Sequence, residues 1–79
     1  MSTARVVLYT RRLCHLCDNA REVVAAVSAE RGVQWREVDI DAEPDLVSRY
    51  GEVVPVVEVD GSQVSYWWID EARLRAALG

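Results

Sequence analysis

The chain has 79 residues, of which 51% are hydrophobic, and its formal net charge is −4. We expect one domain over residues 1–79, because a second domain would leave neither half enough apolar surface for a core. The hydrophobic fraction argues against intrinsic disorder. No basic run with interleaved aromatic residues is present, which argues against nucleic acid as a partner. The longest apolar runs, at 6–9 and 53–57, are too short to cross a bilayer, so we expect no membrane partner.

The first two predicted elements are a strand over 5–10 and a helix over 14–31. The strand contains the apolar run at 6–9, which is typical of a central strand covered on both faces. In the helix, apolar residues recur at spacings of three and four, as an amphipathic helix requires: Cys17, Ala20, Val24 and Val27. Gly32 follows at the position where a left-handed residue ends a helix.

The middle of the chain predicts a second strand and a short helix. The strand spans 34–40 and mixes apolar with polar residues. We expect the helix to run through Tyr50 with Asp41 as its N-cap. Pro44 is tolerated in its first turn, where the missing N–H has no partner to lose, and Gly51 ends it.

Two further strands, at 56–59 and 63–68, flank the dipeptide Asp60-Gly61. Both residues of this dipeptide tolerate the positive φ of a two-residue hairpin turn, so the two strands should be antiparallel. A regular strand directs Trp67 and Trp68 to opposite faces of the sheet. We therefore expect one of these rings in the core and the other partly exposed.

A last helix begins at Asp70, which is a suitable N-cap residue, and Ile69 with Leu74 forms a hydrophobic staple across its start. Leu74 and Leu78, one turn apart, dock this helix on the sheet. The predicted order is βαβαββα, in which the first two strands are parallel because a helix joins them. The sequence therefore predicts an α/β fold with a four-stranded mixed sheet flanked by three helices.

Cys14 and Cys17 form a Cys-x-x-Cys motif at the first turn of the first predicted helix, directly after a strand. No secretory signal precedes that strand, so we expect a cytoplasmic location, where such a pair is typically reactive or metal-binding. Unpaired N–H groups and the helix dipole favour a thiolate at Cys14. Cys17 lies one turn along on the same face and can form a disulfide with it. Arg11, Arg12 and His15 add positive charge, which lowers the pKa of Cys14 further.

Residues 7–17, Val-Leu-Tyr-Thr-Arg-Arg-Leu-Cys-His-Leu-Cys, resemble the active-site segment of glutaredoxins. The Cys-His-Leu-Cys form resembles a branch of small bacterial glutaredoxin-like proteins. A second match is Val54-Pro55, which falls where this family has a Val-Pro with a cis peptide bond. The similarity in element order and spacing extends from about Arg5 to Leu78, and it implies a thioredoxin-like fold of the glutaredoxin type.

The resemblance also implies a role for each matching residue. Cys14 is the nucleophile and Cys17 is the resolving cysteine. Arg11 matches a basic residue that helps to bind the carboxylate of glutathione. The main chain of Val54, next to Pro55, is a docking edge for an extended thiol substrate.

One segment departs from the glutaredoxin pattern. After the hairpin, glutaredoxins carry a Gly-Gly followed by an Asp, which together receive the glutamyl end of glutathione. Here the stretch 65–70 reads Ser-Tyr-Trp-Trp-Ile-Asp, with two bulky rings in place of the open glycine surface. This difference argues against glutathione as the specific substrate, whereas thiol–disulfide exchange does not depend on that pocket.

The sequence predicts an enzyme, a monomeric thiol–disulfide oxidoreductase that reduces protein or low-molecular-weight disulfides. His15 belongs to the expected substrate site as an exposed group that tunes the local charge. We expect no organic cofactor and no metal, and the electron donor is glutathione, another low-molecular-weight thiol or a reductase. The main alternative is an iron–sulfur cluster or metal held by these cysteines between two subunits, since one motif supplies only two of about four ligands. A third possibility is a thioredoxin-like interaction module with idle cysteines.

Overall fold

The computed structural model describes residues 4–79, so that residues 1–3 of the predicted domain lie outside the described part. In chain order, its elements are β1 (Val6–Thr10), α1 (His15–Arg31), β2 (Trp35–Asp39), the 3₁₀ helix η1 (Ile40–Ala42), α2 (Pro44–Tyr50), β3 (Val56–Val59), β4 (Ser62–Tyr66) and α3 (Glu71–Leu78). None of the helices among these residues has the length and apolar character that crossing a bilayer requires.

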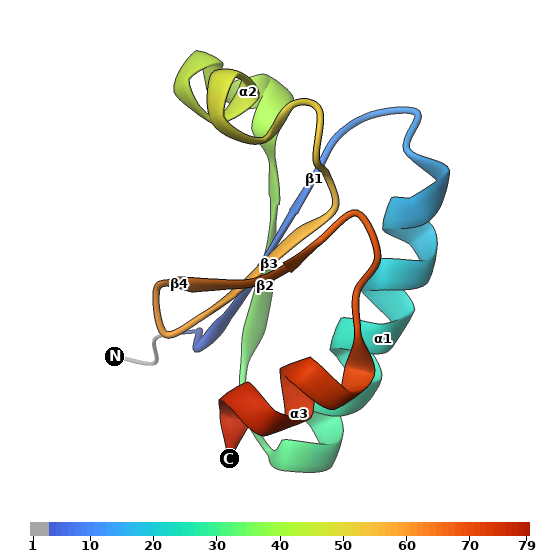
Figure 1. Cartoon of the computed structure of the whole chain (residues 1–79), viewed down its shortest axis with the longest axis vertical. Helices are drawn as coiled ribbons and strands as arrows, with labels where there is room; N and C mark the ends of the chain where they lie inside the picture. Colours follow the sequence, from blue (N-terminus) through green and yellow to red (C-terminus); the bar gives the residue numbers. More distant parts are fainter. Residues whose placement is uncertain (1–3) are drawn as a thin grey trace.

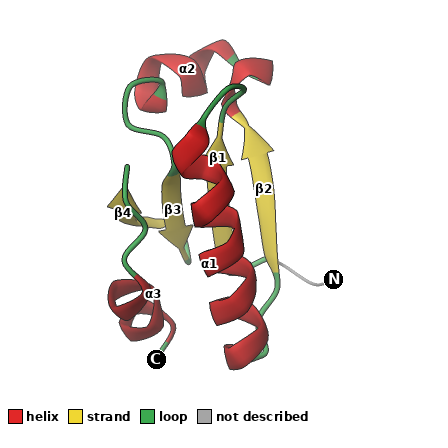
Figure 2. Cartoon of the chain, turned by 90° about the vertical axis from the view of Figure 1, so that its right-hand side faces the viewer, coloured by secondary structure: helices red, strands yellow, loops and turns green. Residues whose placement is uncertain are grey.

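The four strands form one sheet in the order β2-β1-β3-β4. β1 pairs in parallel with β2, where Leu8 lies opposite Glu37, and antiparallel with β3, where Leu8 lies opposite Val57. β3 and β4 form an antiparallel hairpin, in which Asp60 and Gly61 both have positive φ. These directions confirm the predicted mixed sheet and the βαβαββα order, to which η1 is added (Figure 2).

Helices α1 and α3 cover one face of the sheet, and α2 covers the other (Figure 1). Successive side chains of a strand point to opposite faces of the sheet, which explains why each face has its own helices. Val6 and Leu8 of β1 pack with α1 and α3, whereas Tyr9 packs with residues of α2. The core on the α1 side consists of buried residues from four elements and the loop before α3: Val6, Leu8, Ala20, Val24, Val27, Val57, Val59, Ile69, Leu74 and Leu78. The docking of α3 through Leu74 and Leu78 is therefore confirmed.

The caps of α1 and α3 follow the local sequence signals. Gly32 ends α1 with a left-handed backbone, φ 67°, which costs a residue without a Cβ little. Asp70 precedes α3, and its carboxylate accepts hydrogen bonds from the N–H groups of Ala72 at 2.9 Å and Arg73 at 3.2 Å. Both caps are as predicted. A single residue, Gly32, determines the C-terminal end of α1, and a single residue, Asp70, determines the N-terminal end of α3.

The prediction that Asp41 caps the helix ending at Tyr50 is wrong. α2 begins at Pro44, and Glu43 in the N-cap position has the extended backbone (φ −135°, ψ 112°) that a following proline favours. This extended residue separates α2 from η1, within which Asp41 lies. The carboxylate of Asp41 is therefore available for a different partner.

The strand predicted to continue through Trp68 ends at Tyr66, and neither tryptophan lies in the core. Trp67 and Trp68 are 54% and 67% exposed, so the expectation that one ring would be buried is wrong. At Trp67 the backbone is left-handed, with φ 63°, and its N–H donates to the carbonyl oxygens of Val53 at 3.0 Å and Pro55 at 2.8 Å. This turn of the backbone ends the alternation on which the prediction depended.

Ser28 lies on the buried face of α1, and its hydroxyl has no hydrogen-bond partner among the described residues. We expect Ser28→Ala to raise the free energy of unfolding by about 1 kcal/mol, because it removes an unsatisfied buried polar group and improves helix propensity. Urea denaturation measures the change. The control is Ser48→Ala at an exposed position of α2, where only propensity is gained. A less stable Ser28→Ala protein would contradict the expectation.

Candidate active site

Cys14 and Cys17 lie at the start of α1 and are joined by a disulfide bond. Cys14 occupies the N-cap position and Cys17 lies in the first turn, with 5.3 Å between their Cα atoms. Cys14 is partly exposed, whereas Cys17 is 1% exposed and belongs to the core. The two sulfur-bearing residues therefore differ in their access to a substrate.

The backbone around Cys14 makes this position favourable for a negative charge. Cys14 has extended backbone angles (φ −110°, ψ 104°), and no side chain caps the helix. The N–H of Cys17 donates to the Cys14 carbonyl oxygen at 3.2 Å, whereas the N–H groups before it have no acceptor within the helix, and the helix dipole places partial positive charge at the same point. When the disulfide is reduced, both effects stabilise a thiolate at Cys14.

The dithiol opens into a cavity of about 370 Å³ at the junction of the β1–α1 loop with α1. The lining also includes an apolar side chain and five ionisable ones: Leu13, Arg11, Arg12, His15, Asp18 and Arg21. His15 is exposed at this cavity, as expected. The structure therefore brings together four residues of the predicted site, namely the two cysteines, Arg11 and His15.

The charges of the three cavity arginines are compensated unequally. Arg21 donates to Glu37 at 2.7 Å and to Asp18 at 2.9 Å. Arg11 also forms an ion pair. The exposed guanidinium of Arg12 forms no ion pair or hydrogen bond within residues 4–79. Arg12 is therefore the one cavity arginine whose guanidinium has no directly bonded partner in the described part of the chain.

Arg11 holds the loop before the dithiol to two segments that lie 30 and 40 residues further along the chain. Its guanidinium donates to Asp41 Oδ1 at 2.9 Å and to the carbonyl oxygen of Gly51 at 3.1 Å. Asp41 Oδ2 accepts the N–H of Arg12 at 3.4 Å. A Cβ at Gly51 would lie 2.5 Å from the Val47 carbonyl oxygen and 3.3 Å from Arg11 Nη1, so glycine permits this approach. Sequence reasoning missed Asp41 and Gly51 as partners, because no local pattern connects such distant residues.

The loop between α2 and β3 contains the other two residues of the predicted site, Val54 and Pro55. Its Val54–Pro55 peptide bond is cis, as the resemblance implies, and Pro55 is buried. Trp67 binds this loop through its indole N–H, which donates to the Glu52 carbonyl at 2.7 Å, and through its backbone N–H, which donates to Val53 and Pro55. The loop runs beside the first turn of α1 in both views (Figures 1 and 2). Sequence reasoning missed this contact of Trp67.

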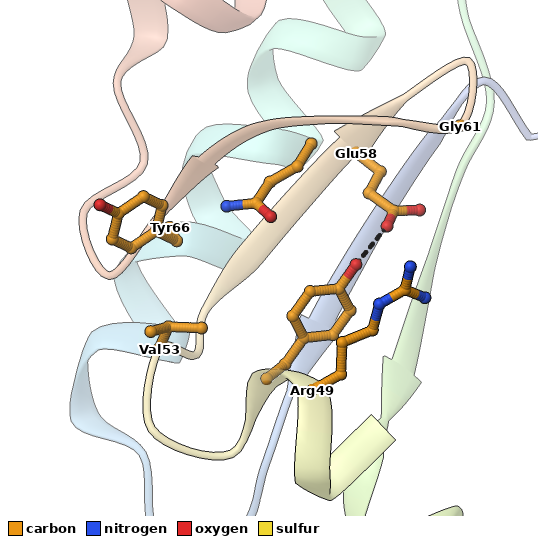
Figure 3. A pocket seen from close by; sticks show the side chains of 7 residues that line it. Arg49, Val53, Glu58, Gly61 and Tyr66 are labelled. Carbon is orange, nitrogen blue, oxygen red and sulfur yellow. Dashed lines mark hydrogen bonds between the residues drawn. The ribbon is translucent and has the colours of Figure 1, made fainter. Parts of the chain in front are cut away.

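A larger cavity, of about 440 Å³, lies on the α2 side of the sheet and shares no lining residue with the first. Glu58 projects toward it, and the dashed line in Figure 3 marks the hydrogen bond that Glu58 accepts from the Tyr50 hydroxyl at 2.6 Å. The other Glu58 oxygen accepts from Tyr9 at 3.0 Å. Burial, and then this hydrogen bond, raise the pKa of Tyr50 to about 12, so it remains a donor at neutral pH. The network links α2 to β1 and β3 and contains no cysteine.

Asp41→Asn should remove a pH-dependent part of the stability. The hydrogen bond from Arg11, first among several causes, holds the pKa of Asp41 below its ordinary value of 3.8. The carboxylate therefore stabilises the folded state above that value, and this contribution is lost as the pH falls through the lower folded-state pKa. Urea denaturation should show a constant advantage of wild type over Asp41→Asn above about pH 4, which shrinks below it. The control is Asp45→Asn, at an exposed carboxylate that forms no ion pair within residues 4–79. If the free energy of unfolding depended on pH in the same way for both variants, the expectation would be contradicted.

Known proteins resemble this chain in sequence over almost its whole length. Residues 5–79 match the family model described as a glutaredoxin-like domain (DUF836). An uncharacterized protein of Mycobacterium tuberculosis is 40% identical over 83 residues, which cover 99% of this chain and 86% of that protein.

Solved structures extend the comparison to the fold. The structural-genomics target protein XcR50 of X. campestris is 40% identical with a TM-score of 0.74, over 92% of this chain and 93% of that chain. A thioredoxin of Fasciola hepatica is 27% identical with a TM-score of 0.63, over 92% of this chain and 75% of that chain. The fold is therefore thioredoxin-like, and the chain belongs to the family of glutaredoxin-like domains.

Proposed function

We propose that this protein is a thiol–disulfide oxidoreductase that reduces disulfide bonds through Cys14 and Cys17. The proposal depends on one observation, the disulfide between a partly exposed and a buried cysteine at the head of α1, beside a cavity. A disulfide that closes so small a loop stabilises a fold little. Its position at a helix N-terminus is instead the kind of environment in which reactive cysteines are found.

In the proposed reaction, the Cys14 thiolate attacks one sulfur of a substrate disulfide. A bond forms between Cys14 Sγ and that sulfur, the substrate S–S bond breaks, and the leaving thiolate takes a proton from solvent. Cys17 then loses its proton to solvent and attacks Cys14 Sγ, which restores the internal disulfide and releases the second substrate thiol. Two electrons pass from the protein dithiol to the substrate.

The groups around the dithiol support this exchange in different ways. The head of α1 and the guanidinium of Arg12, which has no directly bonded partner in the described part of the chain, stabilise the thiolate, and His15 adds positive charge when protonated. The loop of Val54 and Pro55 offers its main chain to an extended substrate. Arg11 positions the β1–α1 loop, because its guanidinium is already bound by carboxylate and carbonyl partners.

The oxidised dithiol has to be reduced after each turnover. We propose that the two electrons come from glutathione, from another low-molecular-weight thiol or from a reductase.

A single-turnover experiment tests the exchange without the need to know this donor. Fully reduced protein, freed of reductant and mixed with excess hydroxyethyl disulfide, should release two thiols per chain and become oxidised. Unchanged protein thiols would contradict the proposal.

A metal-binding function of the same cysteines makes a different prediction. Within residues 4–79, no group of three or more His, Cys, Asp or Glu side chains is placed to hold a metal ion. Such a site would need further ligands from a second subunit or an external thiol. Stoichiometric iron or zinc in anaerobically purified protein, together with no thiol release in the single-turnover experiment, would favour metal binding over exchange.

A further inference from the structure

Five large hydrophobic side chains are exposed in the described part of the chain, and all lie in segments 13–16 and 66–68: Leu13, Leu16, Tyr66, Trp67 and Trp68. The first segment contains the dithiol. The second is hydrogen-bonded to the loop of Pro55, which runs beside the first turn of α1 (Figures 1 and 2). Exposed apolar surface is thus concentrated around the dithiol, and such concentration marks an interaction site.

We call Leu13, Leu16, Trp67 and Trp68 the apolar rim. Two of its members have left-handed backbone, with φ 57° at Leu13 and 63° at Trp67, which costs free energy for any residue other than glycine. The fold does not recover this cost by burying the side chains, since Leu13 is 101% exposed and Trp67 is 54% exposed. Hydrogen bonds to the loop of Pro55 account for the backbone of Trp67, whereas the strained and fully exposed Leu13 indicates a partner that covers it.

The polar part of the site offers little to a small anionic thiol. Arg11 and Arg21 are each bound to carboxylates, so that Arg12 is the one cavity arginine without such a partner within residues 4–79. A small thiol with two carboxylates meets one free guanidinium among exposed apolar side chains. A polypeptide segment with apolar residues beside its cysteine and an acidic residue near Arg12 matches both features.

We propose that the substrate is a disulfide within a protein, in an extended segment whose apolar side chains contact Leu13 beside the dithiol and Trp68 in the segment that follows β4. The proposal rests on the proposed function, because it names the substrate of the same two cysteines. Burial of the apolar rim supplies affinity, and the charge of Arg12 supplies orientation. A small polar thiol leaves the rim in contact with water.

Two synthetic disulfide peptides test this substrate class, with hydroxyethyl disulfide as a small reference. One peptide carries Leu and Phe next to its cysteines, and the other carries Ser at the same places. Wild type should reduce the apolar peptide with a kcat/KM about tenfold higher, the effect of one well-packed apolar contact. Trp68→Ser and Leu13→Ser should each lower this preference, measured as the ratio of the two kcat/KM values. Ala29→Ser, at an exposed position near the other end of α1, should retain it.

The outcomes separate the substrate assignment from the proposed function. Equal rates on the two peptides with wild type, or an unchanged preference in both rim variants, would overturn the assignment. Faster reduction of glutathione disulfide than of the apolar peptide would overturn it as well. Failure to reduce any substrate, hydroxyethyl disulfide included, would instead contradict the proposed function. Circular dichroism should be the same for all variants, because both substituted rim side chains are exposed.

Discussion

Cys14→Ser should reduce thiol release from a disulfide substrate to the uncatalysed background, because a serine hydroxyl stays protonated at neutral pH and cannot replace the thiolate. Cys17→Ser should keep the first half of the reaction, since Cys14 is partly exposed and remains able to attack. The intermediate then has no resolving sulfur and accumulates as a mixed disulfide. Intact-mass measurement after addition of hydroxyethyl disulfide should show one substrate half on Cys17→Ser.

The two single variants serve as controls for each other, because each retains one sulfur of the same pair. The double variant, with serine at both positions, defines the background. A mixed disulfide on Cys14→Ser, together with none on Cys17→Ser, would reverse the two roles. The burial of Cys17, at 1% exposure, argues against that outcome.

Leu8→Ala should lower the free energy of unfolding by roughly 2–5 kcal/mol, the range for truncation of a buried leucine. Leu8 is 0% exposed in the middle of β1 and belongs to the core between the sheet and α1. A chain of this length has a total stability of roughly 4–12 kcal/mol, so the loss is a large fraction of it. Urea denaturation of the oxidised proteins, monitored by tryptophan fluorescence, measures the difference.

The same change at Leu13 is the matched control, because that side chain is fully exposed. Leu13→Ala should alter the free energy of unfolding by no more than about 0.5 kcal/mol, as is usual for surface positions. A loss at Leu13 as large as that at Leu8 would contradict the packing described above. A small loss at Leu8 would contradict it equally.

Local patterns were sufficient for most of the fold. The helical spacing of apolar residues placed the buried face of α1 correctly, and the turn residues at 60–61 placed the hairpin. Once these elements are known, the parallel crossover and the two-residue turn leave few arrangements of four strands. The position of the dithiol followed in the same way, because the strand, the motif and the helix are consecutive in the sequence.

The features that escaped prediction depend on contacts between distant segments. Trp67 leaves the strand where its N–H binds carbonyl groups of the loop before β3, and nothing within 63–68 indicates that contact. Asp41 has the side chain of an N-cap, but the extended residue before Pro44 delays the helix. Its carboxylate binds Arg11 instead, 30 residues away in the sequence. Residue type predicts what these side chains can bind, and only the assembled fold determines which partner is within reach.

The pH dependence of alkylation tests most directly whether Cys14 is an accessible thiolate ahead of a buried Cys17. Reduced protein is treated with limiting iodoacetamide over a range of pH, and the modified residue is identified by mass spectrometry. We predict modification at Cys14, with a midpoint well below the ordinary cysteine pKa of about 8.5. Modification of Cys17 first, or a Cys14 midpoint at or above that ordinary value, would contradict the account.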